Sequence, residues 1–173
     1  MAVITLTEEE LMDGLRFVHK VRENKRIYEV TDKKFDKNNS SYSVNLMGRL
    51  GEIACAKTLG LQVDNSIVPS GDDGHDLKSA LGKSIQVKTS TLPQLIFNAP
   101  ELFVSDYAVL VRFIGDKQLP HVDSKFEIMG WIEREIFLAN YFNHDYGYGI
   151  RLVMNADQLK PIEELVYEIS RPK

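Results

Sequence analysis

The feature that most constrains the fold is the stretch GDDGHDLKSALGKSIQVKTST, which spans residues 71–91. Two short strand-like segments flank a glycine-containing turn at residues 80–83, and this pattern predicts a β-hairpin. Successive side chains of a strand point to opposite faces, so Gln86 and Lys88 lie on one face of the second strand and its apolar residues on the other. The first strand alternates in the same way. If the polar faces coincide, Asp76, Gln86 and Lys88 bring an acid, an amide and an ammonium group together.

Length and composition indicate one globular domain over residues 1–173, with 43% hydrophobic and 27% charged residues. No apolar run approaches the ~20 residues of a membrane span. The first residues, MAVITLTEEE, are acidic where a secretory signal would be basic. Cys55 is the single cysteine and fits a reducing compartment. We therefore expect a cytoplasmic protein that does not cross a membrane.

Charge is unevenly distributed along the chain. Residues 14–37 contain eight Lys or Arg and four Asp or Glu, whereas the whole chain carries a net charge of −4. A basic segment on an acidic body is compatible with phosphate binding, and equally with a solvated helix face.

Periodicity and caps predict helices over about residues 8–23 and 43–59, the first opened by a Thr7–Glu10 capping box. We expect an N-terminal helical segment at about 1–43, a core at about 44–114 and a C-terminal elaboration at about 115–173. The remaining expected elements are strand-like segments at 26–30, 61–63, 106–114, 126–132 and 151–154, a short helix at 133–140, an aromatic loop at 141–149 and a helix-like turn at 155–165.

Glu52 lies off the apolar stripe of the second helix, and its helical neighbours Gly48, Cys55 and Ala56 are small. A carboxylate in such surroundings can be approached by a metal ion, a phosphate or another backbone. The alternative is that Glu52 faces water while Gly48 and Gly51 allow close packing against a sheet.

The order of Glu52 on a helix, Asp76 on a strand and Gln86-Val87-Lys88 on the next strand resembles the PD-(D/E)XK nuclease superfamily. The resemblance covers about residues 44–114. It implies an α/β fold with a restriction endonuclease-like core, that is, a mixed four- or five-stranded sheet flanked by helices.

The resemblance also implies roles for individual residues. Asp76 would be the principal metal ligand, and Gln86, where the family usually has Glu or Asp, would coordinate through its amide oxygen. The Val87 carbonyl is a further possible ligand, and Glu52 would reach the metal directly or through water. Lys88 would position the attacking water or offset charge on the phosphate. The implied cofactor is Mg²⁺, with Mn²⁺ as a substitute.

The expected function is a metal-dependent endodeoxyribonuclease with DNA as its partner, acting as a homodimer if it cuts both strands of a duplex. A hard cation and an ammonium group suit phosphodiester hydrolysis, in which negative charge develops. The candidate DNA contacts are Lys33, Lys34, Arg49, Thr89, Ser90 and Thr91.

Four alternatives remain open at this point. Asp76 and Lys88 can form a simple cross-strand ion pair, and the hydroxyls at 89–91 can be solvated at a strand end. The amide at Gln86 supplies no charge, so the chain can be a nuclease-fold DNA-binding or assembly protein without activity. It can also be a regulatory protein whose residues 14–37 dock on an acidic partner.

Overall fold

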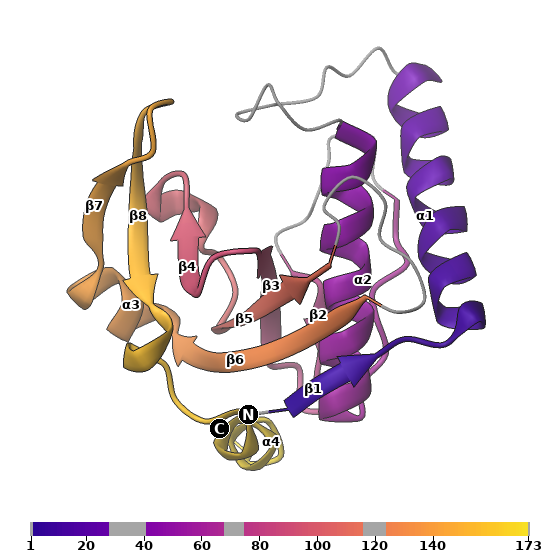
Figure 1. Ribbon diagram of the computed structural model, residues 1–173. Coiled ribbons are helices and arrows are strands. Elements are labelled where there is room, and N and C mark those ends of the chain that lie inside the picture. Colours follow the sequence, from indigo (N-terminus) through magenta and orange to yellow (C-terminus); the bar gives the residue numbers. More distant parts are fainter. Residues whose placement is uncertain (1, 28–40, 68–74, 116–123, 173) are drawn as a thin grey trace.

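The computed structural model describes residues 2–27, 41–67, 75–115 and 124–172. These residues form a mixed α/β fold in which a curled five-stranded sheet is flanked by helices, with a smaller three-stranded sheet on its other side (Figure 1). This arrangement confirms the predicted α/β class and the mixed sheet.

The five-stranded sheet has the order β1-β6-β5-β3-β2. Its strands are β1 (Ala2–Thr5), β2 (Leu77–Lys78), β3 (Ser84–Ser90), β5 (Tyr107–Ile114) and β6 (Lys125–Glu133). β3 and β5 are parallel, and the other neighbouring pairs are antiparallel. The continuous apolar run of β5 predicted a central strand, and β5 does lie between β6 and β3 with both faces buried.

The long helix α2 (Ser41–Leu59) packs against one face of this sheet, and α1 (Glu8–Ile27) lies beside α2 and adds side chains to the same core (Figure 1). α4 (Ile162–Ile169) contributes to the same core. The predicted capping box is present, because the Thr7 amide donates to Glu10 at 2.7 Å and the Glu10 amide donates to the Thr7 hydroxyl at 3.2 Å. The prediction of a strand-like segment at 26–30 is wrong for residues 26 and 27, because α1 extends through Ile27. Residues 28–30 lie outside the described residues.

The opposite face of the sheet packs on α3 (Arg134–Asn140) and the three-stranded sheet of order β4-β8-β7. Its strands are β4 (Gln94–Phe97), β7 (Phe142–Asp145) and β8 (Ile150–Asn155), and two short 3-10 turns, Pro100–Leu102 and Ala156–Gln158, flank them. The prediction of a loop at 141–149 is wrong in part, because residues 142–145 form the strand β7. All four of its residues are exposed, so no apolar alternation marks it in the sequence.

The alternation predicted for β3 is confirmed by the two hydrophobic clusters. Ile85 and Val87 belong to the core under α1 and α2, whereas the β5 neighbours of Gln86 and Lys88, Ala108 and Leu110, belong to the core under the second sheet. No helix in the described part of the chain is long and apolar enough to cross a membrane.

Candidate functional site

The hairpin of β2 and β3 is short. Leu77 pairs with Ile85 and Lys78 with Ser84, and Gly82 has a φ of +79° in the connecting turn. The expected strand at 61–63 is reduced to one bridge, between Val63 and Leu77. β2 therefore covers only the first residues of β3, and the edge of β3 beyond Ile85 lies next to the chain that enters β2.

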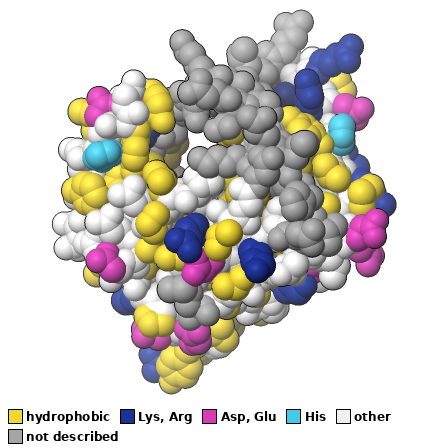
Figure 2. All heavy atoms as spheres, in the orientation of Figure 1, with side chains coloured by type: hydrophobic (Ala, Val, Ile, Leu, Met, Phe, Trp, Pro, Cys, Tyr) yellow, Lys and Arg dark blue, Asp and Glu magenta, His cyan; other side chains and the backbone are white. Residues whose placement is uncertain are grey.

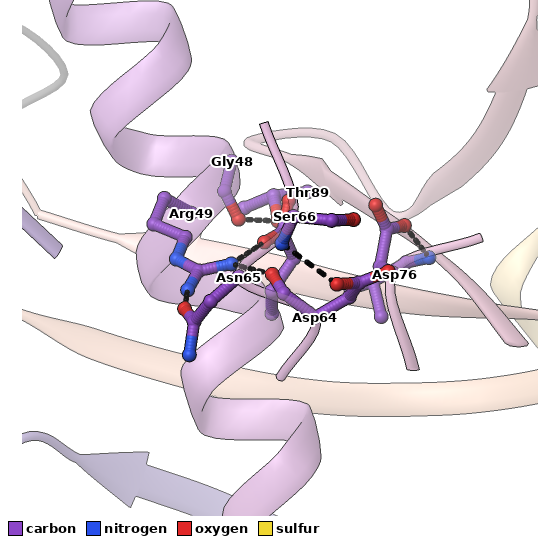
Figure 3. A network of polar contacts seen from close by, with 9 residues as sticks. Gly48, Arg49, Asp64, Asn65, Ser66, Asp76 and Thr89 are labelled. Carbon is purple, nitrogen blue, oxygen red and sulfur yellow. Dashed lines mark hydrogen bonds and ion pairs between the residues drawn. The ribbon is translucent and has the colours of Figure 1, made fainter. Parts of the chain in front are cut away.

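Asp76 lies at this entry point. Its amide donates to the Ile85 carbonyl at 2.9 Å, and its carboxylate Oδ2 accepts a hydrogen bond of 2.6 Å from the Val87 amide (Figure 3). Because the N–H and C=O of one strand residue point to the same side, the Val87 carbonyl also faces this edge. The Asp76 carboxylate is thus fixed beside the residue between Gln86 and Lys88.

Gln86 and Lys88 share the other face of β3. Gln86 is 4% exposed, and its Oε1 has no hydrogen-bond partner within the described residues. The Lys88 ammonium lies 5.0 Å from the centre of the Phe97 ring, and the side chain is half-buried. No carboxylate of the described residues forms an ion pair with Lys88, so the cross-strand pair considered above does not form.

Glu52 comes from α2, on the face opposite to Gln86 and Lys88. Its Oε2 accepts a hydrogen bond of 2.9 Å from Arg49. Burial raises the pKa of the Cys55 thiol strongly, and the charges of Asp76 and then Glu52 raise it further. Both carboxylates therefore lie near Cys55, at the junction of α2 with the β3 edge.

A glycine contact explains why α2 lies so close to β3. A Cβ at Gly51 would stand 1.9 Å from the Thr89 hydroxyl oxygen, whereas a Cβ at Gly48 would meet nothing within 4 Å. The Thr89 hydroxyl donates to the Gly48 carbonyl at 3.5 Å. The close packing that the sequence left open as an alternative is thus present at Gly51.

The structure does not support Arg49 as a DNA contact. Its side chain is 7% exposed, and its guanidinium donates to Glu52, to the Asp64 carbonyl and to the Asn65 side chain (Figure 3). Asp64 and Asn65 were not singled out in the sequence, where nothing links them to Arg49. The i, i+3 spacing of Arg49 and Glu52 is the one signal that predicts part of this network.

The other candidate DNA contacts have mixed outcomes. Thr89 packs on α2, the Ser90 hydroxyl accepts a bond of 3.0 Å from the Leu92 amide, and Thr91 is half-buried. Lys33 and Lys34 lie outside the described residues. On the face shown in Figure 2, the Lys and Arg side chains of the described residues stand in small separate groups without forming a continuous basic surface.

Donor atoms of the kind that suits a hard cation lie around β3, with Glu52 and Gln86 on opposite faces of the strand. Two carboxylates, one buried amide oxygen and one backbone carbonyl are oxygen ligands of the kind Mg²⁺ prefers. The Oε1 of Gln86 is the observation that fits a cation best, because a buried amide oxygen is costly when, as among the described residues, it has no hydrogen-bond partner. Within the described residues, no group of three or more His, Cys, Asp or Glu side chains could hold a metal, so Gln86 and Val87 are needed to complete the set.

Comparison of the chain with protein-family models, with curated proteins and with solved structures gives no match in any of the three.

Proposed function

We propose that this protein is a metal-dependent endodeoxyribonuclease with a restriction endonuclease-like core, and that it hydrolyses DNA phosphodiester bonds at the β3 edge. The single observation that supports this most is the buried Oε1 of Gln86, which has no hydrogen-bond partner among the described residues and lies next in sequence to Val87, whose amide fixes the carboxylate of Asp76. A fold with no use for that oxygen would gain stability from an apolar side chain there.

Four groups would hold the cation: the Asp76 carboxylate, the Gln86 amide oxygen, the Val87 carbonyl and, directly or through water, Glu52. When bound, Mg²⁺ or Mn²⁺ supplies charge that polarises the phosphoryl oxygen and lowers the pKa of water. The Val87 amide orients Asp76 by donating to its Oδ2, so the other carboxylate oxygen has a defined direction.

Lys88 acts on the phosphate group. Its ammonium is a compact charge, held over the Phe97 ring on the same face as Gln86. At this place it offsets the negative charge that develops on the phosphoryl oxygens and orients the attacking water.

The test is cleavage of plasmid and of branched junction DNA in Mg²⁺ or Mn²⁺. Lys88→Met should slow cleavage by about 100-fold or more, because a charge-stabilising group is removed. Lys78→Met is the matched control, since Lys78 is an exposed lysine of the same hairpin and its loss should leave the rate unchanged. Cleavage that survives both Lys88→Met and Asp76→Asn would remove the proposal.

A second candidate function is a DNA-binding or assembly protein that keeps the fold without the reaction. The observation in its favour is that only two of the four proposed cation ligands, the carboxylates of Asp76 and Glu52, carry charge. Calorimetric titration with Mn²⁺ separates the two candidates, because an inert scaffold binds no metal at Asp76.

A further inference from the structure

We infer that Arg49 is a positioning residue of the proposed site. It holds Glu52 directly, and it holds Asp64, whose amide is bonded to the backbone of Asp76. This inference rests on the proposed function. It gives Arg49 a role in the site as a buried residue, whereas the sequence suggested that Arg49 is an exposed contact with DNA.

The guanidinium of Arg49 makes three polar contacts on two elements. One nitrogen, Nη1, donates to Glu52 Oε2 at 2.9 Å and to the Asp64 carbonyl at 2.9 Å. The other, Nη2, donates to the Asn65 side-chain oxygen. Figure 3 shows the side chain reaching from α2 toward the segment of Asp64 and Asn65.

That segment is bonded in turn to Asp76. The Asp64 amide donates to the Asp76 carbonyl at 2.9 Å, so a displacement of Asp64 moves the backbone from which the Asp76 carboxylate projects. The turn is itself fixed, because the Asp64 carboxylate accepts a bond of 2.8 Å from the Ser66 amide. The Ser66 hydrogen bonds are the main reason that the pKa of the Asp64 carboxyl lies below its usual value.

The Arg49 side chain is also immobilised by packing. Its guanidinium carbon lies 3.8 Å from the centre of the Phe17 ring of α1, in the geometry of a cation–π contact. Burial, stacking and several hydrogen bonds hold the guanidinium in one orientation. The groups that accept its hydrogen bonds are therefore held in place as well.

Charge and geometry act in opposite directions at this residue. The positive charge of Arg49 repels a divalent cation, whereas its hydrogen bonds hold one proposed ligand, Glu52, directly and a second, Asp76, through the backbone of Asp64. A substitution that removes the charge would mix the two effects. Arg49→Lys keeps the charge but cannot reproduce the planar fork, so it isolates the geometric effect. Asn65→Ala removes one of the three contacts without any change of charge.

The experiment measures Mn²⁺ affinity by calorimetry and DNA cleavage by steady-state kinetics, at a temperature at which circular dichroism shows every variant folded. Arg49→Lys should weaken Mn²⁺ binding by about tenfold and lower kcat while leaving KM for DNA unchanged, and Asn65→Ala should do the same to a smaller extent. A role in stability alone would lower the Tm without this change in metal affinity and kcat.

Arg171→Lys is the matched control. Arg171 also pairs with a carboxylate three positions away, Glu168 at 3.5 Å, and its guanidinium lies 4.3 Å from the centre of the Tyr167 ring, but it is exposed at the end of α4. This variant should bind Mn²⁺ as the wild type does.

The outcomes are distinguishable. Wild-type affinity and kcat in folded Arg49→Lys and Asn65→Ala, with a wild-type protein that binds Mn²⁺ and cuts DNA, overturn the role of Arg49 alone. A wild-type protein that neither binds Mn²⁺ nor cuts DNA overturns the proposed function and this inference with it.

Discussion

The Gln86 side chain is 4% exposed, and its amide oxygen has no hydrogen-bond partner among the described residues. A buried polar group left unpaired costs about 1–3 kcal/mol of stability. An oxygen of this kind is explained if it binds something that the protein chain does not supply. A divalent cation next to Asp76 is such a partner, and this idea can be tested at the residue itself.

Gln86→Glu should convert the amide into a charged ligand. We expect Mn²⁺ to bind about tenfold more tightly, because affinity for hard cations rises with the number of charged ligands. In the metal-free protein, the variant should have a lower Tm than the wild type, because a buried charge without a partner destabilises the fold. Added Mn²⁺ should restore the Tm. The measurement is the Tm in chelator and in Mn²⁺.

Gln86→Met is the matched change of similar size without the oxygen. It should keep or raise the Tm in chelator and abolish the response to Mn²⁺. An unchanged response to Mn²⁺ in this variant would show that the amide oxygen of Gln86 does not bind the metal.

The residues of the candidate site could be predicted from the sequence, but their contacts could not. The alternation in β3 separates Gln86 and Lys88 from Ile85 and Val87 without any structure. The burial of Arg49 depends on Asn65, Asp64 and Phe17, which reach it through folding of separate elements. A local sequence pattern does not predict contacts between segments that are far apart in the chain.

Among the contacts between helices and strands, the contact of α2 with β3 is the one that positions Glu52. Gly51→Ala would place a Cβ 1.9 Å from the Thr89 hydroxyl oxygen and force the helix away from the strand. We expect the free energy of unfolding to fall by about 1–3 kcal/mol, as in other overpacked contacts. The measurement is urea unfolding.

Gly48→Ala is the control on the same helix, since a Cβ there meets nothing within 4 Å. It should raise the free energy of unfolding by up to about 1 kcal/mol, because alanine favours the helix over glycine. Equal effects of the two substitutions would contradict the account of this contact.

The start of α1 provides a pH-dependent prediction. Burial works to raise the pKa of Glu10, but the Thr7 amide bond and the ion pair with Lys57 at 3.0 Å outweigh it and lower the pKa below its usual value. A lowered folded-state pKa means that the stabilisation is present above the unfolded-state pKa and is lost as the pH falls through the folded-state pKa.

Glu10→Gln should therefore lower the free energy of unfolding by about 0.5 kcal/mol at pH 7, a small value because the pair is partly exposed to solvent. The difference from the wild type should shrink toward zero below about pH 4. Urea unfolding at both pH values is the measurement, with Glu9→Gln as the control for loss of a charge in the same turn. A difference that stays constant with pH would contradict the linkage.

Elements with a strong periodicity could be predicted, and exposed or very short ones could not. The apolar runs of β5 and β6 and the caps and spacing of α1 and α2 mark them in the sequence. β4 alternates half-buried and buried residues over only four positions, three of which are apolar in the sequence, and β7 is exposed at every position, so neither is marked by an alternation of polar and apolar residues. β1 was missed because it precedes the capping box of α1 by only two residues.

At the scale of the whole molecule, the five-stranded sheet separates two hydrophobic cores, one under α1, α2 and α4 and the other under the three-stranded sheet. The pairing of β4 with β8 joins segments far apart in the sequence, which local patterns do not reveal. The candidate site lies at the edge of β3, beside both cores. Replacing a polar side chain of the site, such as Asp76 or Lys88, should therefore change metal binding or DNA cleavage while both hydrophobic cores stay intact.

The most direct test of this account is the rate of Mn²⁺-dependent plasmid cleavage by the wild type and by Asp76→Asn, with both proteins shown to be folded. Asn keeps the shape of Asp76 and can still accept the Val87 amide bond, but it removes the charge that would hold the cation. The account predicts cleavage by the wild type that a chelator abolishes, and a rate at least about 100-fold lower in the variant. Equal rates in the two proteins, or no cleavage by either, would contradict it.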